Sequence, residues 1–275
     1  MARIVSTGST LASENFLEKK RRVRRKKLLV SITVFLVLAG FIIFFLRADT
    51  LRIVEVNVFG NEAVSSASVI SVVADELSGY YFWLIPRDST FFYSEKGMKE
   101  TLFHKFPRFN SIETSLVGLQ TLELVVSERE PIALYCDSVA ASSCYFLDET
   151  GLIFDIAPTF SEGVYFTYSL GTPLEFPLGK EFVPREEFWE LDGFVRNLLN
   201  LGIEAKALEI SSRKYTLILS TDAKIIWNKD SNFSLIYSNL EAFLNSEEIA
   251  TQENFLDTLK EMDLSIENKI HWTTQ

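Results

Sequence analysis

The residue types that most often carry catalysis are sparse in this chain. Its two histidines, His104 and His271, belong to different predicted domains, so a Ser-His-Asp triad or a histidine metal site would have to cross between them. Carboxylates are abundant, but their spacing selects no pair, and Asp148 three residues before Gly151 is better explained by a turn than by an acid. The sequence therefore predicts no catalytic residues, no metal site and no cofactor.

One stretch superficially resembles a phosphate-binding loop. In GTPLEFPLGK, seven residues separate Gly171 from Gly179, two of them are proline, and Glu181 follows Lys180. A Walker loop has four residues between its glycines, free backbone N–H groups, and Ser or Thr after the lysine. Because the stretch differs at each point, we predict no nucleotide site and no small-molecule substrate.

A basic run, KKRRVRRKK at residues 19–27, stands out in a chain whose formal net charge is -10. Such runs bind nucleic acid, act as targeting signals, or hold a membrane segment in place. This run has no aromatic residue and directly precedes an apolar segment. We therefore expect it to contact anionic headgroups of the lipid bilayer and no nucleic acid, with nucleic-acid binding kept as the alternative.

The apolar segment Leu28–Leu46 has 19 residues and no charge. As a helix it spans roughly 28 Å, close to the hydrocarbon thickness of a bilayer. The rival interpretations are a buried soluble helix and a cleaved signal peptide, whose apolar region is shorter and ends in a small-residue cleavage site. The sequence after Leu46, RADTLR, has no such site, so we predict one uncleaved transmembrane helix.

Charge differs between the two sides of this helix. Residues 1–27 carry a net charge of +7, whereas the remainder carries -17. Positive charge before a first helix keeps that end in the cytoplasm. We therefore expect a basic cytoplasmic tail (1–27), a single-pass helix in the plasma membrane (28–46), and 229 extracytoplasmic residues.

Cys136 and Cys144 bracket the segment DSVAASS. An exported domain can keep a disulfide, and this separation fits a bridge across a short loop. The alternative is two unpaired, half-buried thiols.

The first exterior segment predicts a strand, two helices and two further strands. Polar residues alternate with Val54, Val56 and Val58, as in a strand with one apolar face. Gly60-Asn61 turns the chain, and Gly118 suits a hairpin between the last two strands. After this first strand, the expected elements are a helix ending near Gly79, a helix at 94–104, and strands at 111–116 and 121–126.

The charged, proline-marked stretch Glu128-Arg129-Glu130-Pro131 predicts a domain joint. After it the sequence is mostly β, with Asp148 and Gly151 in a turn and a loop over 158–184 that contains short strands. The expected strands are 132–136, 144–147, 152–154, 205–211, 215–220, 223–227 and 264–272, and the expected helices are 186–201 and 233–244, with an extension over 253–260.

Four segments in this order resemble a known family: VEVNVFGNEAVSSASVI, LELVVSEREPIALY, FLDETGLIF and MDLSIENKIHW. With the basic tail and apolar helix before them, they resemble the FtsQ/DivIB family of bacterial cell-division proteins. The resemblance implies an α+β chain: a single transmembrane helix, a POTRA domain of order β-α-α-β-β at 47–130, and a β-rich domain with flanking helices at 131–275.

This sequence departs from the family pattern at three places. Ser265 stands where the family usually has Arg, the segment 80–94 is more aromatic than expected of the link between the POTRA helices, and the helical region 233–262 is long. These departures bear on the partner contacts.

The resemblance implies a non-enzymatic scaffold of the divisome that acts in septum formation through protein–protein contacts. Its expected partners are FtsB/DivIC-like and FtsL-like bitopic proteins, which add a strand to the last strand of the β domain. In this chain that strand is SIENKIHW, and the expected partner-binding residues are Ser265, Ile266, Asn268, Lys269, Ile270 and Trp272. The alternative is that Ile266, Ile270 and Trp272 complete the hydrophobic core.

The family's Glu-Arg-x-Pro pattern matches Glu128, Arg129 and Pro131, and we expect these residues to set the angle between the two exterior domains. Two other functions remain alternatives. One is a POTRA-bearing export or assembly factor, although such proteins usually have several POTRA domains and a β-barrel. The other is a membrane-anchored extracytoplasmic enzyme, which would need a convergent site that the sequence does not reveal.

Overall fold

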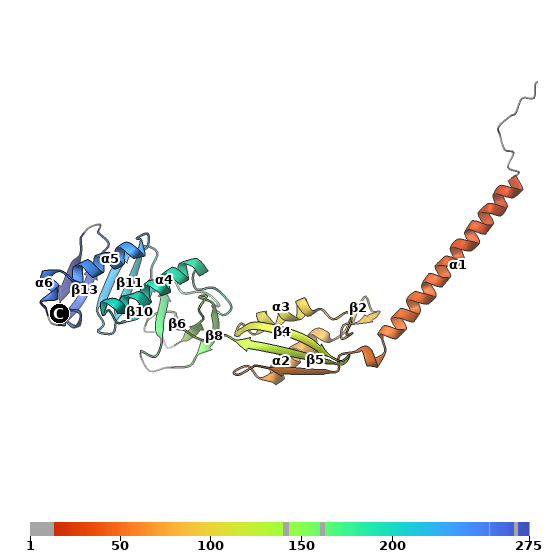
Figure 1. Ribbon diagram of the computed structural model, residues 1–275, viewed down its shortest axis with the longest axis horizontal. Helices are drawn as coiled ribbons and strands as arrows, with labels where there is room; N and C mark the ends of the chain where they lie inside the picture. Colours follow the sequence, from red (N-terminus) through yellow and green to blue (C-terminus); the bar gives the residue numbers. More distant parts are fainter. Residues whose placement is uncertain (1–13, 140–142, 160–162, 253, 267–268, 275) are drawn as a thin grey trace, which may run out of the picture. The chain divides into compact units, whose positions relative to one another are not determined.

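The computed structural model describes residues 14–139, 143–159, 163–252, 254–266 and 269–274 (Figure 1). The chain is a mixed α+β protein that begins with one long helix and contains a large β sheet. Its α helices are α1 (Glu14–Leu46), α2 (Ser66–Leu77), α3 (Glu95–Lys105), α4 (Arg185–Asn197), α5 (Phe233–Leu244), α6 (Glu247–Ala250) and α7 (Phe255–Thr258). Short 3-10 turns lie at Asp49–Leu51 and Leu198–Leu201.

The strands follow the predicted order closely, with some additions. They are β1 (Glu55–Phe59), β2 (Tyr80–Tyr81), β3 (Ile85–Pro86), β4 (Phe109–Val117), β5 (Thr121–Glu128), β6 (Ala133–Cys136), β7 (Cys144–Leu147), β8 (Ile153–Ala157), β9 (Phe166–Leu170), β10 (Ala205–Ile210), β11 (Lys214–Leu219), β12 (Lys224–Asn228), β13 (Leu259–Asp263) and β14 (His271–Thr274).

Helix α1 is longer than the predicted transmembrane segment, because the basic run continues the same helix toward its N-terminus. Lys and Arg are good helix formers, so the run does not interrupt the helix. The Thr33 Oγ1 donates to the Leu29 carbonyl at 2.9 Å, which satisfies this hydroxyl within the helix. From Glu18 to Leu46 the helix is long and apolar enough to cross a membrane.

Contacts between Cα atoms divide the chain into two compact units. The first contains the described residues up to Asn57, together with Val73–Glu95 and Thr114–Glu123. The second contains Val58–Val72, Lys96–Glu113 and the described residues from Leu124 onward. Strand β5 ends at Glu128, the first residue of the predicted joint, and β6 begins at Ala133, after the joint. The domain limits 47–130 and 131–275 stay a prediction.

A three-stranded sheet has the order β1-β5-β4. Helices α2 and α3 come between β1 and β4 in the sequence, so the expected order of strand, helix, helix, strand, strand is present. The sequence did not predict the small antiparallel hairpin β2–β3 between the helices, which pairs Tyr81 with Ile85. Apolar residues of both helices are buried: Val69, Val72, Val73 and Leu77 of α2, and Met98 and Leu102 of α3.

A nine-stranded sheet has the order β14-β13-β12-β11-β10-β9-β6-β7-β8. Most neighbours are antiparallel, but β9 is parallel to both β6 and β10, and β12 is parallel to β13. Parallel neighbours need a crossover, which α4 provides between β9 and β10 and α5–α7 provide between β12 and β13. The core of this region includes fully buried aromatic side chains of Tyr135, Tyr168, Phe188 and Trp227.

The predicted single strand from Leu264 to Trp272 is wrong. The structure instead has β13 and β14, which pair antiparallel, and the predicted helical extension over 253–260 is limited to α7. The physical reason is local. The Ser265 N–H donates to Asp263 Oδ1 at 2.7 Å, and the Lys269 N–H donates to the Ile266 carbonyl at 3.1 Å. These hydrogen bonds turn the chain and compete with a continuous strand.

Candidate functional site

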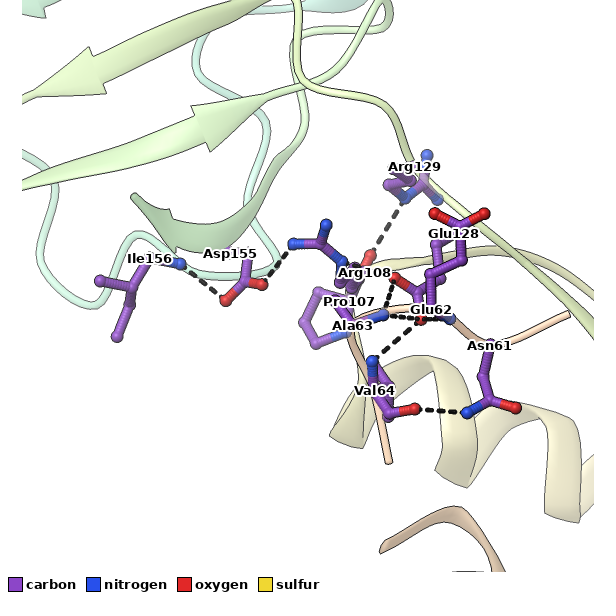
Figure 2. Close-up of polar contacts among 10 residues, drawn as sticks. All are labelled: Asn61, Glu62, Ala63, Val64, Pro107, Arg108, Glu128, Arg129, Asp155 and Ile156. Carbon is purple, nitrogen blue, oxygen red and sulfur yellow. Dashed lines mark hydrogen bonds and ion pairs between the residues drawn. The ribbon is translucent and has the colours of Figure 1, made fainter. Parts of the chain in front are cut away.

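Glu128, at the end of β5, is the centre of a dense polar network in the second unit (Figure 2). Its Oε1 accepts hydrogen bonds from the backbone N–H groups of Glu62 at 2.9 Å and Val64 at 3.0 Å. The Ala63 N–H lies 3.1 Å from both carboxylate oxygens. Oε2 also accepts from the Arg108 Nε at 2.7 Å. One carboxylate thus accepts hydrogen bonds from three consecutive backbone N–H groups and from one guanidinium.

This environment changes the acidity of Glu128, whose side chain is 7% exposed. Burial by itself would raise the pKa of Glu128, but the N–H of Val64 and the Arg108 guanidinium outweigh it and lower the pKa below the ordinary value. The carboxylate is therefore held ionised and fully hydrogen-bonded. Such a group is a structural anchor and a poor general acid or base, which needs a pKa near the working pH.

Arg108 extends the network to the nine-stranded sheet. Its Nη1 donates to Asp155 Oδ2 at 2.6 Å, and its guanidinium lies 5.6 Å from the centre of the Phe154 ring. Asp155 Oδ1 in turn accepts from the Ile156 N–H at 2.8 Å. Both partners of Arg108 lie in the second unit. Arg108 therefore ties the end of β5 to β8.

Sequence reasoning missed Arg108 and Asp155. A signal for Arg108 was present, because Arg108 and Glu128 each lie ten residues from Gly118, the predicted hairpin turn. Residues equally distant from a tight turn become cross-strand neighbours, where opposite charges stabilise the pair. No such signal existed for Asp155, since its approach depends on the packing of a separate sheet.

Arg129 makes a second set of contacts beside the first. Its Nη1 donates to Asp148 Oδ2 at 2.5 Å, its Nε donates to the Pro107 carbonyl at 3.0 Å, and its backbone N–H donates to the Arg108 carbonyl at 2.8 Å. The side chains of Arg129 and Asp148 are 17% and 5% exposed, so this ion pair is largely removed from water. Breaking a buried pair by removing one partner is costly.

Asp148 has the turn role that the sequence predicts and an ion pair that it does not. Its Oδ1 accepts from the N–H groups of Thr150 at 2.8 Å and Leu152 at 3.0 Å, while Oδ2 faces Arg129. Gly151 lies in this turn, as predicted, and has a φ of 78°. A Cβ at Gly151 would lie 2.7 Å from the Phe188 ring, so the turn also requires the absence of a side chain.

The structure thus brings Glu128 and Arg129 into one network through different partners. Pro131 lies in the link between β5 and β6, where its missing N–H removes no strand hydrogen bond. A hollow of about 240 Å³ beside these residues is lined by Ser127, Glu128, Arg129 and Asp148, among others. That volume lies below the range of about 300–1,000 Å³ typical of small-molecule sites.

The predicted partner-binding residues fall mainly in the loop before β14. Ser265, Ile266 and Lys269 lie between β13 and β14, and Ile266 is 51% exposed. Ile270 and Trp272 pack against the core of the nine-stranded sheet. Asn268 lies outside the described residues. The core alternative therefore holds for Ile270 and Trp272, whereas Ile266 and Lys269 are exposed to solvent.

Trp272 is the one predicted partner-binding residue within β14, the terminal strand of the sheet. Its ring packs edge-on against Phe243 of α5, with 5.1 Å between centroids. The Ser265 carbonyl accepts from the Asn228 Nδ2 at 2.8 Å, which fixes the start of the loop against β12. Strand β14 forms one edge of the sheet, and the loop leads into it.

Cys136 and Cys144 form a disulfide. The two residues are cross-strand partners at the ends of β6 and β7, so the bond closes this hairpin. Of the two alternatives open from the sequence, the structure has the bridge.

His104 lies in the last turn of α3 and His271 begins β14, and both belong to the second unit. Within the described part of the chain, no group of three His, Cys, Asp or Glu side chains could hold a metal ion. A groove of about 720 Å³ between α4 and α5 is lined by aromatic rings and amides, including Trp189, Asn197 and Tyr237. Glu190 is the one carboxylate among its lining residues.

No protein-family model matches this chain, and no curated protein matches its sequence. The class of protein is defined by the fold and the polar network. It is an α+β chain with one N-terminal helix able to span a membrane, followed by a β-rich region whose buried charges are paired.

Proposed function

We propose that this chain is a single-pass membrane scaffold of the bacterial cell-division machinery, of the FtsQ/DivIB kind, which links other division proteins through its extracytoplasmic part. Helix α1 would be its membrane anchor, with residues 1–27 in the cytoplasm. The excess of Lys and Arg before the helix supports this orientation, since positive loops stay on the cytoplasmic side. The localisation would be the plasma membrane.

Two further features support the assignment. The order of β1, α2, α3, β4 and β5 is the order that a POTRA domain at 47–130 requires, with the hairpin β2–β3 as an addition. The Glu-Arg-x-Pro pattern is the second feature: Glu128 and Arg129 are almost completely engaged in structural contacts. These contacts give the adjacent charges of Glu128 and Arg129 a structural role, which is what a non-enzymatic scaffold requires of them.

The observation that carries the partner proposal is the sheet edge at β14. A terminal strand leaves N–H and C=O groups without a neighbouring strand, and an extended peptide can satisfy them. We propose that FtsB/DivIC-like and FtsL-like partners add a strand at this edge. The exposed side chains of Ile266 and Lys269 would then contact the partner, and the packed ring of Trp272 would position β14.

A binding measurement tests this proposal. The full-length protein in detergent or nanodiscs is titrated with soluble exterior segments of an FtsB/DivIC-like and an FtsL-like protein. We expect Lys269→Glu to weaken binding by at least tenfold if the partner segment is acidic, because like charges would then meet at the contact. Lys260→Glu on β13 is the matched control, since it makes the same charge change on an exposed residue outside the loop.

Two results would contradict the proposal. Equal weakening by Lys260→Glu and Lys269→Glu would mean that net charge decides binding and that the β14 edge does not. A pull-down of the full chain from its native membrane that contains no FtsB- or FtsL-like protein would contradict the scaffold class itself.

A further inference from the structure

A cluster of exposed aromatic side chains lies in the first unit, in the hairpin β2–β3. The turn Tyr80–Leu84 reads YYFWL, and Phe82 and Trp83 at its tip are 92% and 89% exposed. Tyr80 and Leu84 are each about half exposed, and Phe91 and Phe92 nearby in the sequence are exposed too. Scattered apolar residues are ordinary on a protein surface, but a contiguous aromatic group marks an interaction site.

The backbone of this turn is unfavourable for its own residues. The Leu84 N–H donates to the Tyr81 carbonyl at 3.0 Å, and Phe82 and Trp83 have φ values of 47° and 64°. Two consecutive positive φ values describe the hairpin turn for which Asn-Gly is the usual choice. Bulky residues are disfavoured there because of their Cβ atoms. The fold therefore carries strain at the point where it presents two aromatic rings to the surroundings.

The turn is fastened to the end of the apolar helix. Arg47, the first residue after α1, donates from its Nε to the Leu84 carbonyl at 3.0 Å and from its Nη2 to the Trp83 carbonyl at 2.9 Å. The same guanidinium lies 5.5 Å from the centre of the Tyr80 ring. All of these residues belong to the first unit. The tip of the hairpin is thus held within one side-chain length of the last turn of α1.

We propose that the turn Tyr80–Leu84 is a second membrane contact, in which Phe82 and Trp83 insert into the boundary between headgroups and acyl chains of the bilayer that α1 crosses. Aromatic rings with polar edges prefer this boundary. The cations have the matching chemistry, because Arg47 and Arg87 lie beside the Tyr80 and Tyr81 rings and can meet lipid phosphates. This contact rests on α1 as a span and is independent of the division partners.

We favour a lipid surface over a protein partner because the turn is joined directly to the end of the helix that crosses the membrane. Helix α1 is apolar up to Leu46, so its last turn would lie at the edge of the hydrocarbon, and Arg47 joins the turn to that point. A loop so placed meets lipid before it can meet a soluble partner. The contact would hold the first unit closer to the membrane surface than a single helix and a flexible linker would hold it.

Tryptophan fluorescence tests the proposal, because Trp83 is the only tryptophan of the first unit. The full chain is reconstituted in vesicles of phosphatidylethanolamine and phosphatidylglycerol whose acyl chains are brominated near the glycerol end. We expect part of the fluorescence of the wild type to be quenched by the brominated lipid. This quenching is expected to disappear in Trp83→Phe and to persist in Trp189→Phe, which removes a half-exposed tryptophan of the second unit.

A second variant separates a membrane role from a folding role. Phe82→Asn with Trp83→Gly provides the residues that the turn prefers, so the protein in detergent should melt at the same temperature or higher. Phe82→Asn alone keeps the Trp83 fluorophore, and in this single variant the quenching of Trp83 by brominated lipid should be reduced. The control is Phe176→Asn, an aromatic residue of the second unit with 86% exposure and a φ of 50°, which should leave the quenching unchanged.

Three results would overturn the inference. One is lipid quenching that is equal in wild type and Trp83→Phe. Another is a wild type in which lipid quenches nothing while aqueous acrylamide quenches Trp83 fully, since the turn would then face water and be available to a protein partner. The last is a large loss of thermal stability in the Asn-Gly variant, which would make the aromatic pair a packing element.

Discussion

The Glu128 network and the Tyr80–Leu84 turn use their residues in opposite ways. In the network, buried charges are matched by donors at hydrogen-bonding distance, and the glycine of the adjoining Asp148 turn occupies a backbone position that only glycine accepts easily. In the turn, two large aromatic residues occupy positions that suit Asn-Gly, and their rings are left exposed. The network satisfies its polar groups and its backbone preferences. The turn places bulky residues at unfavourable backbone positions and leaves their side chains unburied.

This difference distinguishes residues that stabilise the fold from residues that we expect to contact an external surface. A region that satisfies its polar groups and backbone preferences lowers the free energy of the folded chain and needs no other explanation. Where a turn violates those preferences and leaves the rings at its tip unburied, an external surface is expected to provide the compensating interaction. Substitutions in the two regions should therefore change stability with opposite sign.

The largest effect is expected for Glu128→Ala. Removing the carboxylate leaves the N–H groups of Glu62, Ala63 and Val64 without their acceptor and leaves Arg108 with Asp155 alone. We expect a loss of about 3–5 kcal/mol in the free energy of unfolding, measured by urea denaturation. Glu130→Ala, an exposed neighbour, should change it by less than about 0.5 kcal/mol. Similar losses in both variants would make the network unimportant.

A smaller loss is expected for Gly151→Ala, which tests the turn of Asp148. The new Cβ would lie 2.7 Å from the Phe188 ring on a backbone with positive φ, so we expect a loss of about 2–4 kcal/mol. Gly118→Ala is the matched control, because Gly118 also has positive φ but no heavy atom within 4 Å. If both variants lose the same stability in thermal melts, packing against Phe188 has no role.

The opposite sign is expected in the aromatic turn. Phe82→Asn with Trp83→Gly should raise the free energy of unfolding in detergent by about 1–2 kcal/mol, because it relieves two unfavourable backbone conformations. Chemical denaturation without lipid measures this gain. If this double variant were instead less stable than the wild type, the two regions would not differ in the sign of their stability changes.

The smallest effect concerns pH. The pKa of Glu128 is lower in the folded chain than the ordinary value of about 4.3, so its stabilisation is complete above that value and is lost as pH falls through the folded pKa. We expect the stability difference between wild type and Glu128→Gln to be largest near neutral pH and to shrink in acid. A difference that stays constant down to the acid transition would mean that the charge of Glu128 is not what stabilises the network.

Much of the local structure could be predicted from the sequence. Strand β7 and helix α5 have the bounds expected from their patterns, and the turn at Gly151 and the hairpin at Gly118 are glycine positions with positive φ. The errors occur where residues distant in sequence decide the outcome. The predicted helical extension over 253–260 overlaps the start of β13, because the pairing of β13 with β12 is parallel and nonlocal. The Arg108–Asp155 pair likewise depends on two separate sheets.

By itself the sequence determined the apolar helix, the charge asymmetry around it, the order of strands and helices in most of the chain, and the turn at Asp148 and Gly151. These properties depend on composition and on spacings of a few residues, which act within one element. Only the tertiary structure decided which charges meet, which strand ends the sheet, and that Arg47 holds the Tyr80–Leu84 turn at the end of α1. Those outcomes depend on packing between elements, where the free energy of a contact is shared by residues far apart in the chain.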